Sequence, residues 1–112
     1  MSKILICSQQ EPLRESLALA IRDDYDLISC DTEEMCLEVV SKTDISVFLL
    51  DIIIHDNPIP FIKKIKTDHP SIKIVLVTNS NKETLAEDAI KAGASRYIMK
   101  PFKSDELLAA CK

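Results

Sequence analysis

The sequence predicts an α/β domain: a flavodoxin-like, doubly wound (βα)5 three-layer sandwich around a five-stranded parallel sheet. Five short runs are nearly continuous in Ile, Val and Leu, as in parallel strands buried on both faces. The intervals between these runs carry apolar residues at helical spacing. With 112 residues and 46% hydrophobic content, the chain is long enough for one such domain without metal or disulfide staples.

The five expected strands are the apolar runs themselves, at residues 3–7, 25–30, 45–51, 72–78 and 96–99. No run reaches the roughly 18 apolar residues that a membrane span needs. The N-terminus also lacks the charged-then-apolar pattern of a signal peptide. We therefore expect a cytoplasmic protein that does not enter a membrane.

Four helices are expected between the strands, and a fifth after the last strand. Pro12 suits the first turn of helix one, and Pro70 ends helix three. Gly93, the only glycine, falls where a left-handed residue would end helix four. Capping-box spacing predicts Asp31 and Ser80 as the N-caps of helices two and four. The apolar faces are Leu13, Leu17, Ala20 and Ile21; Met35, Cys36, Val39 and Val40; Phe61, Ile62 and Ile65; and Leu85, Ala89 and Ala92.

The last helix would open at "KSDELL", with Ser104 or Asp105 as its cap, and it reaches Lys112 after barely two turns. A helix this short covers its face of the sheet poorly. We therefore expect residues 1–112 to be one domain whose last helix is truncated, with a linker or output domain following in the natural protein.

Composition excludes several function classes. A net charge of −4 gives no electrostatic footprint for nucleic acid in this chain. The four cysteines show no CxxC or zinc spacing, so we interpret them as reduced thiols, with Cys7 and Cys30 in the core. The loop "CSQQEP" has no glycine to cradle a phosphate, and neither His55 nor His69 lies at a strand end, where a hydrolase base would be.

Polar side chains gather where the strands end. In the flavodoxin-like order 2-1-3-4-5, ligands bind at the carboxyl ends of the strands, beside the switch point between strands one and three. Ser8 and Gln9 follow strand one, Asp51 ends strand three, Thr78 ends strand four and Lys100 follows strand five. The sequence therefore places its candidate site at this edge.

These residues carry a family resemblance. Asp51, Thr78 inside "VLVT", and "KAGASRYIMKPF" ending in Lys100, Pro101 and Phe102 resemble the receiver domain of two-component response regulators over the whole chain. The resemblance implies that Asp51 is the phosphoacceptor, that Thr78 and Lys100 contact the phosphoryl group, and that Tyr97 reports the switch. Pro101 and Phe102 would fix the conformation of the loop. A carboxylate is a competent nucleophile, and a hydroxyl and an ammonium are suitable donors to phosphoryl oxygens.

The chain departs from the family where receivers hold Mg²⁺. Two acidic residues usually follow strand one, and the matching positions are Ser8 and Gln9. Mg²⁺ is normally bound through one or two carboxylates, so we expect an impaired site and a doubtful metal. Glu11 and Asp56 are the candidates that could substitute for the missing acids.

Two functions from different classes follow. In the first, the chain is a receiver in a phosphorelay: a sensor histidine kinase or phosphotransfer protein phosphorylates Asp51. The face of helix four, strand five and helix five then binds an output domain or a second copy. In the second, it is a phosphorylation-independent pseudo-receiver, an interaction module with Asp51 and Lys100 as a structural pair. Neither is an enzyme beyond self-phosphorylation and autodephosphorylation; a flavodoxin-like enzyme is the third, weakest interpretation.

Overall fold

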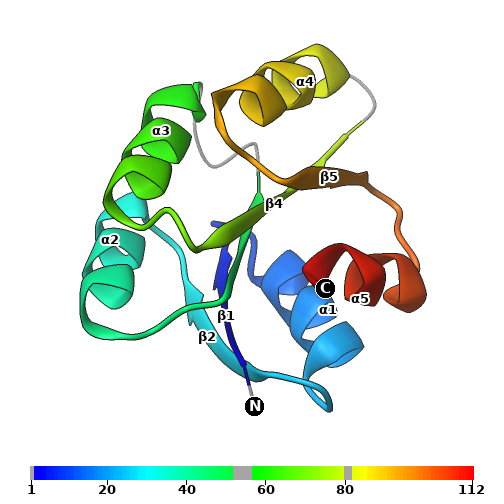
Figure 1. Ribbon diagram of the computed structural model, residues 1–112. Coiled ribbons are helices and arrows are strands. Elements are labelled where there is room, and N and C mark those ends of the chain that lie inside the picture. Colours follow the sequence, from blue (N-terminus) through cyan, green and yellow to red (C-terminus); the bar gives the residue numbers. More distant parts are fainter. Residues whose placement is uncertain (1, 52–56, 80–81) are drawn as a thin grey trace.

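A computed structural model describes residues 2–51, 57–79 and 82–112 of the chain. Five parallel strands form one sheet in the order β2-β1-β3-β4-β5, with helices on both faces (Figure 1). This confirms the expected fold class and strand order. The strands are β1 (Lys3–Cys7), β2 (Asp26–Cys30), β3 (Val47–Asp51), β4 (Lys73–Thr78) and β5 (Arg96–Met99). The helices are α1 (Glu11–Ile21), α2 (Glu33–Lys42), α3 (Ile59–Asp68), α4 (Glu83–Ala92) and α5 (Ser104–Cys111).

The central strand β3 sets the position of the site. All five of its residues are buried, as expected for a strand covered on both faces. The parallel register pairs Cys7 of β1 with Cys30 of β2 and with Leu50 of β3, and pairs Asp51 with Val77 of β4. The carboxyl ends of the strands therefore lie side by side, and the side chain of Asp51, the last residue of β3, lies among them.

Two apolar cores lie on opposite faces of the sheet, because successive strand residues point to opposite sides. Phe48 and Leu50 join the core beneath α2, α3 and α4, where Phe48 packs edge-on against Phe61 with ring centroids 5.8 Å apart. Val47 and Leu49 join the core beneath α1 and α5. Figure 1 shows this division of the helices between the two faces. Packing in both cores therefore fixes the position of the end of β3.

The helix ends agree in part with the capping residues expected from the sequence. Gly93 ends α4 with φ of 127°, a positive value that favours glycine. The expected cap of α2 is wrong by one residue: Thr32, not Asp31, is the N-cap, and its hydroxyl accepts the Met35 amide at 3.2 Å. Lys103, rather than Ser104 or Asp105, stands at the N-cap of α5, because both already lie inside the helix. The expected cap Ser80 lies outside the described residues.

The Thr32 cap gives a stability prediction. Thr32→Ala removes the acceptor for one of the unpaired amides of the first turn of α2, so we expect the free energy of unfolding to fall by about 1 kcal/mol. Ser41→Ala is the control, because that exposed hydroxyl only donates to the Glu38 carbonyl within the helix. Urea unfolding followed by circular dichroism measures both variants. Equal losses would show that the cap contributes nothing specific.

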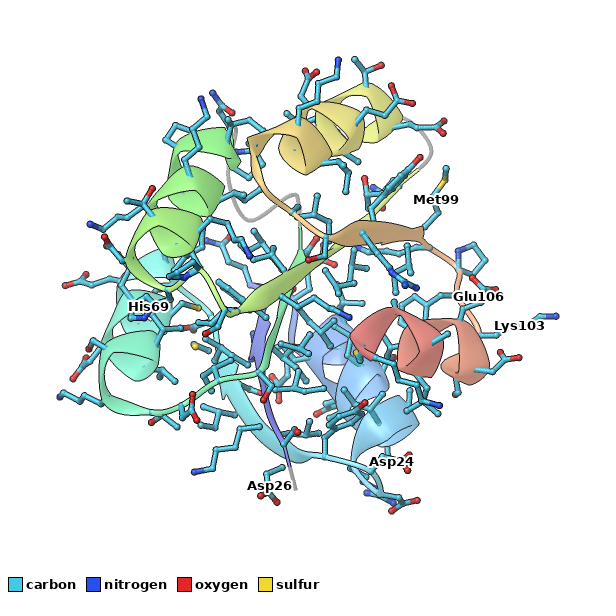
Figure 2. The ribbon with its side chains drawn as sticks, viewed as in Figure 1. Asp24, Asp26, His69, Met99, Lys103 and Glu106 are labelled. Carbon is cyan, nitrogen blue, oxygen red and sulfur yellow. The ribbon has the colours of Figure 1, made fainter. Side chains whose placement is uncertain are left out.

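The remaining expectations concern cysteines, histidine and membrane segments. Cys7 and Cys30 are buried in the core, and all four cysteines are free thiols. His69, labelled in Figure 2, is the C-cap of α3 before β4 begins, so it does not lie at the carboxyl end of a strand. Met35 is 47% exposed instead of packing with the rest of its expected face, because Cys36 and Val40 fill that core. Among the helices described, none has the length and apolar character needed to cross a bilayer.

Candidate functional site

Asp51 is the centre of the candidate site. Its side chain is only 1% exposed at the end of β3. The Ser8 hydroxyl donates to Asp51 Oδ2 at 2.8 Å, and Lys100 Nζ lies 3.6 Å from Oδ1. Burial of a carboxylate is costly unless it has such partners. The structure therefore brings together three residues that the sequence placed after strand one, at the end of strand three and after strand five.

Ser8 is held by its own contacts at the carboxyl end of β1. Its amide donates to the Cys30 carbonyl at 3.2 Å, and its hydroxyl oxygen accepts the Gln10 amide at 3.0 Å. Arg14 Nη1 in the first turns of α1 donates to the Ser8 carbonyl at 2.6 Å. Arg14 is not among the site residues predicted from the sequence, although its position six residues after Ser8 lets its long side chain reach back to the carboxyl end of β1. These contacts fix the backbone of Ser8, so that its hydroxyl points toward Asp51.

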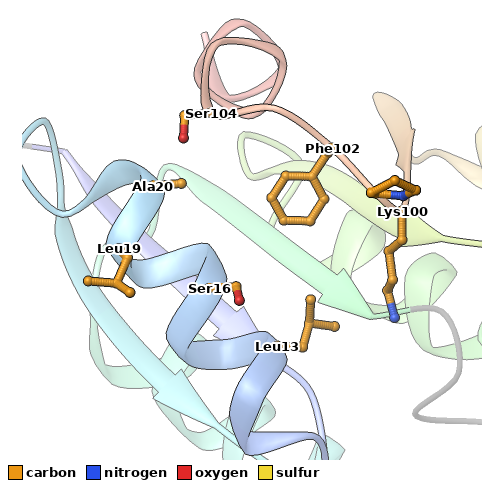
Figure 3. Close-up of a pocket in the computed structure, with 8 residues that line it drawn as sticks. Leu13, Ser16, Leu19, Ala20, Lys100, Phe102 and Ser104 are labelled. Carbon is orange, nitrogen blue, oxygen red and sulfur yellow. The ribbon is translucent and has the colours of Figure 1, made fainter.

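Lys100 reaches Asp51 from the loop after β5. Its amide donates to the Thr78 carbonyl at 2.8 Å, and the peptide bond to Pro101 is cis. Phe102 is half-buried and packs against the core beneath α1 and α5. Figure 3 shows the Lys100 ammonium beside the end of β3, at one side of a cavity of about 510 Å³ between α1 and this loop. Besides Lys100, Pro101 and Phe102, the cavity is lined by Leu13, Ser16, Leu19, Ala20 and Ser104.

Thr78 and Tyr97 lie on β4 and β5, the two strands that follow β3 in the sheet. Thr78 is fully buried at the end of β4, and its hydroxyl donates to the neighbouring Asn79 carbonyl at 3.3 Å. Tyr97 on β5 donates to Glu83 at the start of α4, also at 3.3 Å. Desolvation, followed by the Glu83 charge, raises the pKa of Tyr97, so the phenol remains a neutral donor. Thr78 therefore joins the site through the Lys100 backbone, whereas Tyr97 connects β5 to α4.

The described residues at the carboxyl ends of the strands do not fit a Mg²⁺ site. The Ser8 hydroxyl is already engaged with Asp51, and Gln9 is exposed. Glu11 is exposed at the first residue of α1, and Asp56 lies outside the described residues. Within residues 2–51, 57–79 and 82–112, no cluster of three or more His, Cys, Asp or Glu side chains could hold a metal. A hard dication prefers several oxygen ligands with carboxylates among them, so this arrangement lacks the charge that it needs.

Comparison with known proteins gives one consistent family. The family model described as "Response regulator receiver domain" matches residues 4–112. The transcriptional regulatory protein LnrK of Bacillus subtilis is 29% identical over 98% of this chain and 52% of its own length. The chemotaxis protein CheY of Listeria monocytogenes is 29% identical over 98% of this chain and 95% of its own length.

Several relatives are much longer than this chain, which spans about half of LnrK and 24% of an NtrX-like putative response regulator of Rickettsia typhi. Among solved structures, the receiver domain of NtrX from Brucella abortus superposes with a TM-score of 0.89, at 24% identity and over 95% of this chain and 92% of that one. At that identity the likeness establishes the fold alone. It agrees with the sheet order described above.

Proposed function

The chain belongs to the response regulator receiver domain family, and we propose that Asp51 is the residue on which this receiver accepts a phosphoryl group. The observation that carries the proposal is the contact of Lys100 Nζ with Asp51 Oδ1 at 3.6 Å, at the carboxyl edge of the sheet. An ammonium beside a nucleophilic carboxylate can pair with the oxygens of an incoming phosphoryl group.

The step is the transfer of a phosphoryl group to a carboxylate, which forms an acyl phosphate on Asp51. A carboxylate oxygen of Asp51 forms the new O–P bond while the P–N bond of a phosphohistidine donor, or the P–O bond of a small acyl phosphate, breaks. The electron pair of the broken bond leaves with the imidazole or carboxylate. Lys100 stabilises charge on the phosphoryl oxygens, and Thr78 supplies a hydroxyl if it turns from the Asn79 carbonyl. The protein partner is then a sensor histidine kinase or a phosphotransfer protein.

This receiver works with an impaired Mg²⁺ site. Ser8 and Gln9 stand at the positions where the family resemblance places acids. Ser8 donates a hydrogen bond to Asp51, whereas an acid at that position would bind a cation together with Asp51. We therefore expect Lys100 to supply much of the positive charge that the phosphoryl group meets. Phosphorylation should be slow and should depend only weakly on Mg²⁺.

The output acts through the face formed by α4, β5 and α5. Receiver domains interact with histidine kinases and output domains, and relatives of this chain include longer regulators. Tyr97 joins β5 to Glu83 of α4, and Ile90 on α4 is 37% exposed. A change of charge at Asp51 that reached β5 through Lys100 could alter this face. Its partner is an output domain of the same protein or a second copy of the chain.

One observation favours a second function, a phosphorylation-independent interaction module. Asp51 is 1% exposed and both its carboxylate oxygens have partners, Ser8 and Lys100. A carboxylate held in this way could be a structural element that keeps the domain in one conformation. In that case Asp51→Asn would leave the affinity for a partner unchanged.

Incubation with acetyl phosphate, with and without Mg²⁺, tests the proposed function. We expect intact mass spectrometry to detect one added phosphoryl group on the wild-type chain, with a yield that Mg²⁺ changes by less than about threefold. Asp51→Asn should show none, because an amide does not form the acyl phosphate. Ser46→Ala is the matched control, since Ser46 lies at the amino ends of the strands, just before β3 and away from Asp51.

The outcomes separate the two functions. No phosphoryl group on the wild-type chain, while an ordinary receiver reacts in the same tube, would contradict phosphorylation on Asp51 and support the interaction module. A yield that requires Mg²⁺ would contradict the impaired site and point to Glu11 or Asp56 as replacement ligands.

A further inference from the structure

A pair of buried thiols lies beside the candidate site and takes no part in the proposed phosphoryl transfer. Cys30 ends β2, and Cys36 lies in the second turn of α2. Cys36 Sγ donates to Cys30 Sγ at 3.2 Å, and both residues are buried, with relative exposures of 0% for Cys36 and 3% for Cys30. The sulfur atoms already face one another across the strand-to-helix turn. A disulfide bond would require them to close to roughly 2 Å, an approach of about one ångström.

We propose that Cys30 and Cys36 form a reversible dithiol–disulfide site that is oxidised by hydroperoxides. The site is independent of the phosphorylation proposed for Asp51. It is intramolecular, and it closes a short loop between β2 and α2.

The chemistry assigns different roles to the two thiols. The S–H bond donated by Cys36 lowers the pKa of the Cys30 thiol. Burial and the negative charge of Asp31 oppose this shift, and the positive charge of Arg14 adds to it. The pKa of Cys36 is raised, chiefly because it donates to Cys30 and then because of its hydrogen bond with Cys7. We assign Cys30 as the thiol that reacts first, because it is the more exposed of the two, at 3% against 0%, and because a lowered pKa favours the nucleophilic thiolate form. Cys36 is the proton-bearing partner that resolves the first product.

The steps balance with hydrogen peroxide as oxidant. The Cys30 thiolate attacks one peroxide oxygen, the O–O bond breaks, and hydroxide leaves, which gives a sulfenic acid on Cys30. Cys36 sulfur then attacks the Cys30 sulfur and displaces hydroxide, which takes up the Cys36 proton. Two thiols thus lose two electrons and two protons to one peroxide, and two waters form. The low exposure of Cys30 favours this small oxidant over a bulky disulfide such as oxidised glutathione.

Trypsin digestion separates the cysteines cleanly. Cleavage after Lys and Arg leaves Cys30 and Cys36 together in the peptide of residues 23–42. Cys7 falls in residues 4–14 and Cys111 in residues 104–112. Both of these other cysteines are also buried, at 0% and 5% exposure, so they are internal controls for burial alone.

The experiment treats the folded chain with hydrogen peroxide, removes the oxidant with catalase, and alkylates all free thiols in denaturant before digestion without reductant. We expect peptide 23–42 to be two hydrogens lighter and to carry no alkyl group, whereas peptides 4–14 and 104–112 are alkylated. Treatment with dithiothreitol before alkylation should restore two alkyl groups on peptide 23–42. Circular dichroism confirms that the chain stays folded during oxidation.

Two variants test the assigned roles. Cys36→Ser should leave a sulfenic acid on Cys30 that dimedone traps, and Cys30→Ser should leave Cys36 free for alkylation. Full alkylation of peptide 23–42, under conditions that oxidise a dithiol peptide in the same tube, would overturn the proposal. A cross-link between peptides 4–14 and 23–42 would overturn it too, because the oxidised partner would then be Cys7.

Discussion

Ser8→Asp should destabilise the chain without Mg²⁺ and make its stability depend on the metal. Ser8 is fully buried and donates to Asp51 at 2.8 Å, so the new carboxylate would face an existing one with no hydroxyl between them. Two like charges about 4 Å apart repel by roughly 4 kcal/mol at an effective dielectric of about 20. Arg14, which already bonds the Ser8 carbonyl, offsets part of this repulsion. We expect the free energy of unfolding to fall by about 2–3 kcal/mol.

Mg²⁺ should reverse most of that loss, because the ion can bind between two carboxylates. With a dissociation constant near 0.1 mM, about 10 mM Mg²⁺ would stabilise the variant by about 2.7 kcal/mol. The wild-type chain should gain less than about 0.5 kcal/mol at the same concentration. Urea unfolding with and without Mg²⁺ measures both effects, with NaCl at matched ionic strength as the reference.

Ser8→Asn is the matched control, since it has nearly the shape of Asp but no charge. Its stability should not respond to Mg²⁺, whatever the cost of the substitution itself. Adding Gln9→Asp to Ser8→Asp should tighten the metal further at little cost in stability, because position 9 is exposed. A wild-type chain that Mg²⁺ stabilises as much as Ser8→Asp would contradict the impaired site.

The fold could be predicted from the sequence because β1, β3 and β4 are buried on both faces and therefore appear as continuous apolar runs. All five strands appeared within two residues of their expected bounds. The errors fall at helix ends, where capping depends on the backbone angles of single residues: Thr32 has the extended conformation that lets its hydroxyl accept from Met35. Capping-box spacing alone favoured Asp31, one residue too early.

The candidate site could be predicted in part. Asp51 and Lys100 are brought together as the resemblance implied, because the ends of β3 and β5 share one edge of the sheet. The hydrogen bond from the Ser8 hydroxyl to Asp51 could not be predicted, since nothing in the sequence fixes the direction in which the hydroxyl at position 8 points. The Cys30–Cys36 contact could not be predicted either, because a spacing of five intervening residues matches no recognised cysteine motif. The two sulfur atoms come within 3.2 Å only because the chain turns from β2 into α2.

Lys100→Met should slow phosphorylation of Asp51 by about 10²- to 10³-fold, if Lys100 supplies the positive charge that a metal would otherwise provide. The variant keeps an unbranched apolar stem but removes the ammonium 3.6 Å from Asp51 Oδ1. In phosphoryl transfer, negative charge is spread over the three equatorial oxygens, so a fixed cation beside them lowers the barrier. The rate of phosphoryl incorporation from acetyl phosphate, followed by intact mass, measures the effect.

The same substitution should also lower the free energy of unfolding, by about 1–3 kcal/mol, because the buried Asp51 loses a charged partner and keeps the Ser8 hydroxyl. Lys63→Met is the control for removing one lysine charge, since Lys63 is exposed on α3, and it should change neither quantity. Lys100→Arg separates the two roles: its charge should preserve stability, while its different shape and reach should slow transfer. If Lys100→Met lost stability but reacted at the wild-type rate, the ion pair would be structural, and the charge for phosphoryl transfer would have to come from elsewhere at this edge of the sheet.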